Sequence, residues 1–511
     1  MLVHALASQW VGVNVIPKEA RDMWAITAIS GFMRDTFMRK LAGNNEYRYQ
    51  QKLASEQVFE QDVERYSIHQ LGAQLDIDPS EYEFMALKSA VVLFILDRRL
   101  TKASGAAGVG RIITRLLLNA KTGDLQNGEL STDWFHRLCE KLGHTKLDAF
   151  FKQWVYGAGC PLFKVNQRFN KKKLVVEMNI YQIQRERKIK PELSPTNFMR
   201  EAKEQVSEVW APEVSDPFTG PMTIRIHEAD GTPYEHIVEI KDTHTKIEIP
   251  YNTKYKRLKR SKRAKERAMA ANGMDLGGEA ENDVLLYCLG DVLQSEDEVK
   301  DWRLVDWGKE EEDRMGQESY EWIRMDADFE WIGKIDLIMP IYMYVSQLQQ
   351  DRDVVAQYEV SSKKLQGCNF VLTNPQSLQH VLKQNAHPLM STILVRTLMD
   401  RRYFHGIRTL AAEGLTKCAT PSLNWVGQYH LERAFQEFFC FADSPMPRAN
   451  DFSDRMGYLL QKAIPIALSH VKDERGKVPM SVRRFFVDKL KFNDNSNNEV
   501  SWMCSFCFTE G

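Results

Sequence analysis

Apolar positions in the first third of the chain recur with the period of an α-helix. Leu87, Val91 and Ile95 are spaced by four residues, and side chains at that spacing lie on one face of a helix. Ile113 and Leu116 follow the same rule at a spacing of three. The pattern predicts a helical lobe over residues 1–156.

The period changes to two after Pro161. Residues 162–169 alternate apolar and polar side chains, residues 170–173 are a polar turn, and alternation returns over residues 174–181. This arrangement predicts a β-hairpin. Three further extended runs occupy residues 222–227, 234–240 and 246–249. Because short strands separated by turns typically form two packed sheets, we expect a β-sandwich over residues 157–345.

Two segments interrupt the expected β-sandwich. The first, at about residues 185–221, contains five prolines, and the second, at about 254–318, is highly charged. Proline punctuation and dense charge favour irregular, solvated chain. We therefore expect both segments to be surface excursions.

Helical periodicity returns at about residue 346. The expected helices are residues 387–399, 403–417, 424–440, 451–471 and 478–490. Within the third of them, Leu431, Phe435 and Phe438 share one face. Consecutive amphipathic helices on short loops predict a HEAT-like α-solenoid over residues 346–500, followed by a divergent tail at 501–511. The predicted fold class is multidomain α+β.

Composition narrows the classes of protein that remain. Of the 511 residues, 43% are hydrophobic and 10% aromatic, which excludes global disorder. There are 68 Lys and Arg against 69 Asp and Glu, so the net charge is −1 and any function based on charge must be local. Apolar runs are too short to span a bilayer, and we expect no membrane association. Cys504 and Cys507 lack a second ligand pair, so no zinc site is predicted there.

One local concentration of charge stands out. Nine cations fall within fourteen residues: Lys254, Lys256, Arg257, Lys259, Arg260, Lys262, Arg263, Lys265 and Arg267. This basic run has the density of a nuclear import signal or of a segment that contacts DNA phosphates, and an inert solvated loop is the third interpretation. Tyr255 is its one aromatic residue, so base stacking is not expected.

The N-terminal segment has part of a zinc-peptidase pattern. A zinc peptidase has two histidines one helical turn apart with a catalytic glutamate beside the first, written H-E-x-x-H. Here the corresponding residues are His4, Ala5 and Ser8, and Thr27 stands where a third ligand, a glutamate, would follow. A single histidine does not make a zinc site, so we expect no metal, no cofactor and no catalytic residues.

The spacing of these positions, with Trp10 and Trp24, resembles that of the M1 family of zinc aminopeptidases. In that family a tyrosine that stabilises the oxyanion precedes a lysine by two positions, and here Ala86 precedes Lys88. The resemblance implies a pseudo-aminopeptidase, since alanine donates no hydrogen bond to an oxyanion. The family's substrate loop and β domain would lie before Met1, so we expect the chain to be an N-terminally truncated fragment or gene model.

Longer strings are similar to a narrower family, that of TFIID subunit 2, the aminopeptidase-like TATA-binding-protein-associated factors. They are residues 153–161, 167–173, 320–331, 346–357 and 489–495. The resemblance implies a non-catalytic nuclear scaffold that binds core-promoter DNA around the initiator. It also implies contacts with the largest TATA-binding-protein-associated factor, with a histone-fold subunit's tail and, within the complex, with the TATA-binding protein. The alternative is a residual M1-type zinc aminopeptidase.

Overall fold

The structure is a computed structural model that describes most of the chain. The described residues are 2–63, 65–72, 79–105, 108–184, 198–207, 217–228, 233–251, 288–361, 388–442, 444–496 and 498. They divide into two compact units, which are treated separately below. The first contains residues 1–227, 233–254 and 323–339, and the second contains residues 228–232, 255–322 and 340–511. Among the described residues, no helix has the length and apolar character that a bilayer span requires.

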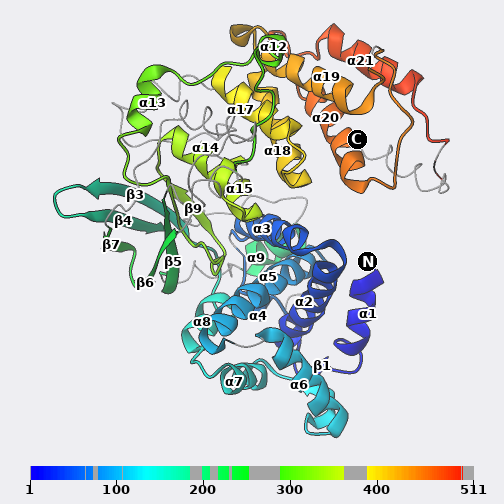
Figure 1. The fold of residues 1–511 in the computed structure, drawn as a ribbon. Coiled ribbons are helices and arrows are strands. Elements are labelled where there is room, and N and C mark those ends of the chain that lie inside the picture. Colours follow the sequence, from blue (N-terminus) through cyan, green and yellow to red (C-terminus); the bar gives the residue numbers. More distant parts are fainter. Residues whose placement is uncertain are drawn as a thin grey trace. The chain divides into compact units, whose positions relative to one another are not determined.

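The first unit begins with a helical lobe, as the apolar periodicity predicts (Figure 1). Its helices are α1 (Leu2–Trp10), α2 (Met23–Ala42), α3 (Asn44–Gln61), α4 (Ile68–Leu71), α5 (Pro79–Ser104), α6 (Val109–Thr122), α7 (Thr132–Gly143) and α8 (Asp148–Trp154), with α9 (Phe198–Ser207) later in the chain. Short 3-10 turns lie at Ala20–Asp22 and Gln126–Gly128, and the two-residue strands β1 (Ile16–Pro17) and β2 (Glu129–Leu130) pair in parallel.

Local signals set the ends of several lobe helices. Gly43 ends α2 with a φ of +91°, a conformation that favours glycine. Ser131 begins α7, since its hydroxyl accepts a hydrogen bond from the Trp134 backbone N–H at 3.3 Å. Helix α5 packs against both α2 and α3. Its apolar side chains from Ala90 to Leu96 are all buried and form the centre of the lobe.

The rest of the first unit consists of two sheets. The strands are β3 (Leu162–Asn170), β4 (Val175–Ile183), β5 (Gly220–His227), β6 (Pro233–Ile240), β7 (His244–Pro250), β8 (Trp322–Arg324, which crosses the unit boundary) and β9 (Lys334–Leu337). The strand orders are β7-β4-β3-β9 and β6-β5-β8. The predicted hairpin is confirmed as β3 and β4, with Leu162 paired to Ile183 and Asn170 to Val175. Strand β9 joins β3 in parallel, and no local alternation predicted it.

The lobe and the sheets of the first unit share a buried aromatic cluster. Trp154, at the end of α8, is fully buried, with its ring centroid 4.7 Å from that of Phe218 and 6.4 Å from that of Trp331. Phe163 of β3 contacts Trp331 edge-on at 5.3 Å. Nearby, the Lys102 ammonium of α5 donates to Asp328 at 2.8 Å. Apolar contact and ion pairing together fix α5 and α8 against the sheets.

The second unit is helical among its described residues. Its helices are α12 (Glu296–Asp301), α13 (Lys309–Met315), α14 (Ile341–Gln350), α15 (Val354–Glu359), α17 (Pro388–Met399), α18 (His405–Leu415), α19 (Val426–Phe439), α20 (Arg455–Ser469) and α21 (Met480–Lys491), with 3-10 turns at Thr416–Cys418 and Pro421–Leu423. Helices α17 to α21 confirm the five helices expected from residue 387 onward. Each begins or ends within about four residues of its predicted bounds.

The expectation of a surface excursion is wrong for the end of the charged segment. Residues 288–318 belong to the second unit, and Trp302 and Leu304 within them are buried. The Gly290 N–H donates to Asp400 at 2.7 Å, and the Val305 N–H donates to the Thr392 hydroxyl at 2.9 Å. Charge density misled the prediction because a few well-placed apolar side chains are enough to anchor an otherwise polar segment. The earlier part of that segment, residues 254–287, lies outside the described residues.

His430 is the polar centre of this anchor. Its side chain is fully buried, with Nδ1 2.7 Å from the Ser391 hydroxyl and Nε2 2.7 Å from the Trp302 carbonyl oxygen. Burial lowers the pKa of His430 to about 4. The folded protein therefore holds this imidazole neutral at pH values where the unfolded chain protonates it.

The titration of His430 predicts a loss of stability in acid. Because its folded pKa lies below the ordinary value of 6.5, the unfolded chain binds more protons between pH 6.5 and 4, and stability falls as the pH falls through that range. The expected loss is about 3 kcal/mol. Thermal unfolding from pH 7.5 to 4 measures it, with His430→Gln as the matched variant. Gln keeps a donor for Trp302 and does not titrate, so an equally steep acid profile in His430→Gln would contradict this origin.

Candidate functional site in the helical lobe

The residues of the partial zinc-peptidase pattern lie on α1 and α2, two helices that pack against each other. Ser8 is one turn after His4, but its hydroxyl donates to the His4 carbonyl oxygen at 2.9 Å, so it is engaged with its own helix. Ala5 is exposed. The position of the expected general base therefore carries no acid or base.

The surroundings of His4 disfavour both protonation of its imidazole and binding of a metal ion to it. Burial lowers the pKa of His4, and the nearby positive charge of Arg34 lowers it further. The same charge that opposes protonation of the imidazole also opposes a metal ion beside it. The buried Nδ1 of His4 has no hydrogen-bond partner within the described part of the chain.

Thr27 is buried inside the lobe. Its hydroxyl lies 3.0 Å from the Ser89 hydroxyl of α5 and donates to the Trp24 carbonyl oxygen at 2.9 Å. Both hydroxyl side chains are nearly inaccessible to solvent. The position where the resemblance expects a zinc-binding glutamate is therefore a hydroxyl contact that joins α2 to α5.

Lys88 makes a short ion pair in the lobe interior. Its Nζ donates to Asp62 Oδ2 at 2.6 Å, and both side chains have no exposed area. The Cys160 thiol also approaches Asp62 Oδ2, at 3.4 Å. A second buried pair joins Arg65 to Glu81 at 3.0 Å. Each of these charges is neutralised by a protein partner, which is typical of structural ion pairs rather than of groups that act on a substrate.

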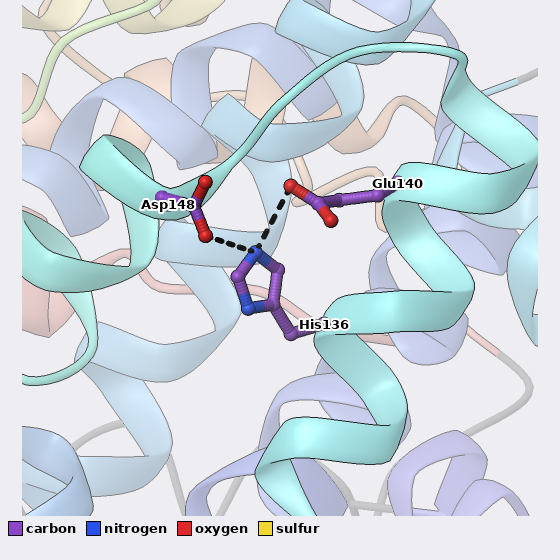
Figure 2. A group of neighbouring side chains, drawn as sticks. All are labelled: His136, Glu140 and Asp148. Carbon is purple, nitrogen blue, oxygen red and sulfur yellow. Dashed lines mark ion pairs between the residues drawn. The ribbon is translucent and has the colours of Figure 1, made fainter.

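A different trio is the one group in the described residues whose side chains are close enough to share a metal ion. It consists of His136, Glu140 and Asp148, whose ligand atoms all lie within 4.8 Å of one another. Figure 2 shows the two carboxylates pointing toward the same imidazole nitrogen, from α7 and from the start of α8. Nε2 of His136 is 3.4 Å from Glu140 and 3.9 Å from Asp148.

The contacts of this trio indicate a structural junction between two helices. Oε1 of Glu140 accepts a hydrogen bond from the Leu147 N–H at 2.7 Å, and Asp148 is 80% exposed. The His136 ring stacks on Phe151 with centroids 4.1 Å apart. The trio therefore holds α7 against α8. The i, i+4 spacing of His136 and Glu140 was visible in the sequence, but Asp148 has no such local relation to them.

The basic run lies outside the described residues, so nuclear import, contact with DNA phosphates and an inert loop all remain open for it. Cys504 and Cys507 also lie outside the described residues. The pattern residues His4, Ala5, Ser8 and Thr27 are described, and they are not joined by any further ligand within the described ranges.

Comparison with known proteins gives the class of the chain. Residues 158–340 match a family model described as the TAF2 Ig-like domain, and residues 342–504 match one described as TAF2-like, TPR repeats. The crystal structure of Legionella pneumophila aminopeptidase A in complex with aspartic acid superposes with a TM-score of 0.52 at 10% identity, covering 96% of this chain and 46% of that one. The class is a mixed α+β protein with an aminopeptidase-like fold, an Ig-like domain and C-terminal helical repeats, which confirms the predicted fold class.

Curated relatives identify the family. Transcription initiation factor TFIID subunit 2 of Schizosaccharomyces pombe is 45% identical over 504 residues, which are 98% of this chain and 41% of the relative. The protein of the same name from Saccharomyces cerevisiae is 40% identical over 513 residues, 98% of this chain and 35% of the relative. The chain belongs to the TFIID subunit 2 family. It spans about two fifths of the length of these relatives.

Proposed function

We propose that this chain is a non-catalytic scaffold segment of the general transcription factor TFIID, which acts in the nucleus during assembly of the preinitiation complex for RNA polymerase II. The observation that carries the proposal is its identity of 40 to 45% with two proteins named TFIID subunit 2, over 98% of the chain. Its partners on this proposal are the largest TATA-binding-protein-associated factor, a histone-fold subunit's tail, the TATA-binding protein within the complex, and core-promoter DNA at the initiator.

The test of the scaffold function is recovery of partners. The tagged chain is purified from nuclear extract at moderate salt, and the proteins recovered with it are identified by mass spectrometry. We expect the TATA-binding protein and its associated factors. A folded chain that is recovered alone would contradict the proposal.

The absence of catalysis is proposed from the helical lobe. Ala5, Ser8 and Thr27 stand at the base and ligand positions that the aminopeptidase resemblance implies, and Thr27 is occupied by its contact with Ser89. Without a general base and a bound Lewis acid, neither activation of water nor polarisation of a peptide carbonyl is supplied. Residual zinc aminopeptidase activity is the alternative. It predicts stoichiometric zinc that His4→Ala removes, whereas our proposal predicts no bound zinc by elemental analysis.

Contact between the basic run and promoter DNA is a further part of the proposal. If its cations bind phosphates, affinity falls steeply with salt and depends little on base sequence. We expect that reversing the charges of Lys256, Arg257, Lys259 and Arg260 reduces the magnitude of the slope of log affinity against log salt by about 3 to 4. Filter binding or anisotropy across a salt series measures the slope.

The matched control for this experiment reverses Lys171 and Lys172, two exposed lysines in the turn between β3 and β4. It changes the net charge without touching the basic run, and its slope is expected to stay near that of the parent. A parental slope in the four-residue variant would exclude the run from the DNA interface and leave nuclear import or an inert loop.

A further inference from the structure

A cavity of about 490 Å³ lies in the second unit, lined by residues from the turn before α18, from α18 and α19, from the segment that leads into α20, and from α20 itself. Three arginines line it: Arg401, Arg408 and Arg448. An arginine presents a planar fork of N–H donors that matches a carboxylate. The cavity therefore has donors for an anionic group.

Arg408 is the informative member of the three. Its residue is only 8% exposed, yet its single hydrogen bond within the described residues runs from Nε to the Leu398 carbonyl oxygen at 2.8 Å. It forms no ion pair with any carboxylate in the described part of the chain. Burial, together with the nearby positive charge of Arg401, lowers the pKa of Arg408 to about 10, although the negative charges of Asp400 and Asp454 oppose this shift. A buried cation that has no carboxylate at ion-pair distance is costly, so its presence needs a reason.

Arg401 adds to this unmatched charge. Its guanidinium carbon lies 5.7 Å from the centre of the Phe438 ring, and that of Arg408 lies 5.0 Å from the same centre. Two cations thus lie close to one aromatic ring. Cation–π attraction offsets part of their repulsion but supplies no negative charge.

The two carboxylates of the cavity accept hydrogen bonds from their own segment and make no direct ion pair with Arg408 in the described residues. Asp454 begins α20 by accepting a hydrogen bond from the Gly457 N–H at 2.9 Å. Asp451 accepts from the backbone and hydroxyl of Ser453. Three arginines against two aspartates leave one positive charge in the lining. One carboxylate neutralises that excess, whereas a phosphate dianion would reverse it.

We propose that this cavity binds an aspartate or glutamate side chain of an extended partner segment, with an apolar neighbour of that side chain packed on Phe438 and Met456. The inference does not rest on the proposed membership of TFIID, because peptide binding is measured on the isolated full chain. The rim supports the apolar contact, since Met456 is 43% exposed beside the arginines. The cavity holds a side chain and its flanking residues and is too small for a folded domain.

Fluorescence anisotropy with defined peptides tests the proposal. The probe is a labelled nine-residue peptide, Gly-Ser-Gly-Phe-Glu-Phe-Gly-Ser-Gly, and its controls replace the central Glu by Gln or by phosphoserine. We expect the Glu peptide to bind at least about tenfold more tightly than the Gln peptide, because the charged hydrogen bonds are lost with the carboxylate. Equal binding of the Glu and Gln peptides, or no binding of either up to millimolar concentration, would overturn the proposal. Tight binding of the phosphoserine peptide alone would overturn the assignment to a carboxylate.

Variants locate the binding. Arg408→Gln is expected to lose about tenfold or more in affinity for the Glu peptide. Arg401→Gln replaces an exposed residue and keeps the test valid if Arg408→Gln fails to fold, with an expected loss of about threefold to tenfold. Arg455→Gln is the matched control, since Arg455 is exposed next to Asp454 and does not line the cavity. Its affinity is expected to stay within about twofold of the parent. Parental affinity in both Arg401→Gln and Arg408→Gln would exclude this cavity as the site.

Discussion

Asp62→Ala is expected to lower the free energy of unfolding by about 3 to 5 kcal/mol, because it leaves Lys88 as a buried charge without its partner. The two side chains have no exposed area and their charged atoms lie 2.6 Å apart. The Cys160 thiol would also lose its acceptor. Chemical denaturation measured by circular dichroism gives the loss directly, with the slope against denaturant checked for a common unfolding transition.

Two comparisons isolate the charge effect. Asp62→Leu with Lys88→Met removes both charges and is expected to recover most of the lost stability, since apolar residues of similar size replace buried ion pairs at little cost. Arg34→Ala breaks an ion pair with Asp35 in which the Arg34 side chain is 41% exposed. This variant is expected to lower the free energy of unfolding by less than about 1 kcal/mol. If Asp62→Ala cost no more than Arg34→Ala, the buried pair would have no special weight in the lobe.

Trp154→Ala is expected to be comparably severe, with a loss of about 3 to 5 kcal/mol. The indole is fully buried against Phe218 and Trp331, so truncation opens a cavity where α8 meets the sheets of the first unit. Loss of contact at this position should loosen the sheets as well as the helix. Hydrogen exchange is therefore expected to increase in β3 and β5 as well as in α8.

Trp154→Phe is the matched variant. It keeps an aromatic ring and removes an indole N–H that has no hydrogen-bond partner among the described residues. Its expected cost is about 1 to 2 kcal/mol, since the smaller ring leaves a smaller void. Equal losses of unfolding free energy in Trp154→Ala and Trp154→Phe would mean that packing of the Trp154 ring does not hold α8 against the sheets.

Local patterns in the sequence predicted the elements that depend on local chemistry. The alternation at residues 162–169 and 174–181 corresponds to β3 and β4, because one face of each strand is buried. The helices from α17 onward follow from their apolar faces. Strand β9 pairs with β3 across more than 160 residues of chain, and no local period encodes a partner at that distance.

The candidate sites likewise divide into those that a local sequence pattern reveals and those that form only between distant segments. Sequence spacing brought His4, Ser8 and Thr27 into one pattern, and the structure places them on two helices in contact. The pairing of Lys88 with Asp62 and the convergence of Arg401 and Arg408 on Phe438 join side chains from different elements. Such groups have ordinary residue types and no shared spacing, so they become visible only when the fold brings them together.

The most direct test of the central claim replaces the matching segment of the fission yeast relative with this chain. The claim is that the chain is a non-catalytic part of a TFIID scaffold, and the 45% identity over 504 residues makes the exchange feasible. The tagged chimaera is purified from nuclear extract and its associated proteins are quantified by mass spectrometry against the unmodified relative. If the chain is part of the scaffold, the TATA-binding protein and its associated factors are recovered at levels close to those of the unmodified protein. A stable chimaera recovered without them would contradict the claim.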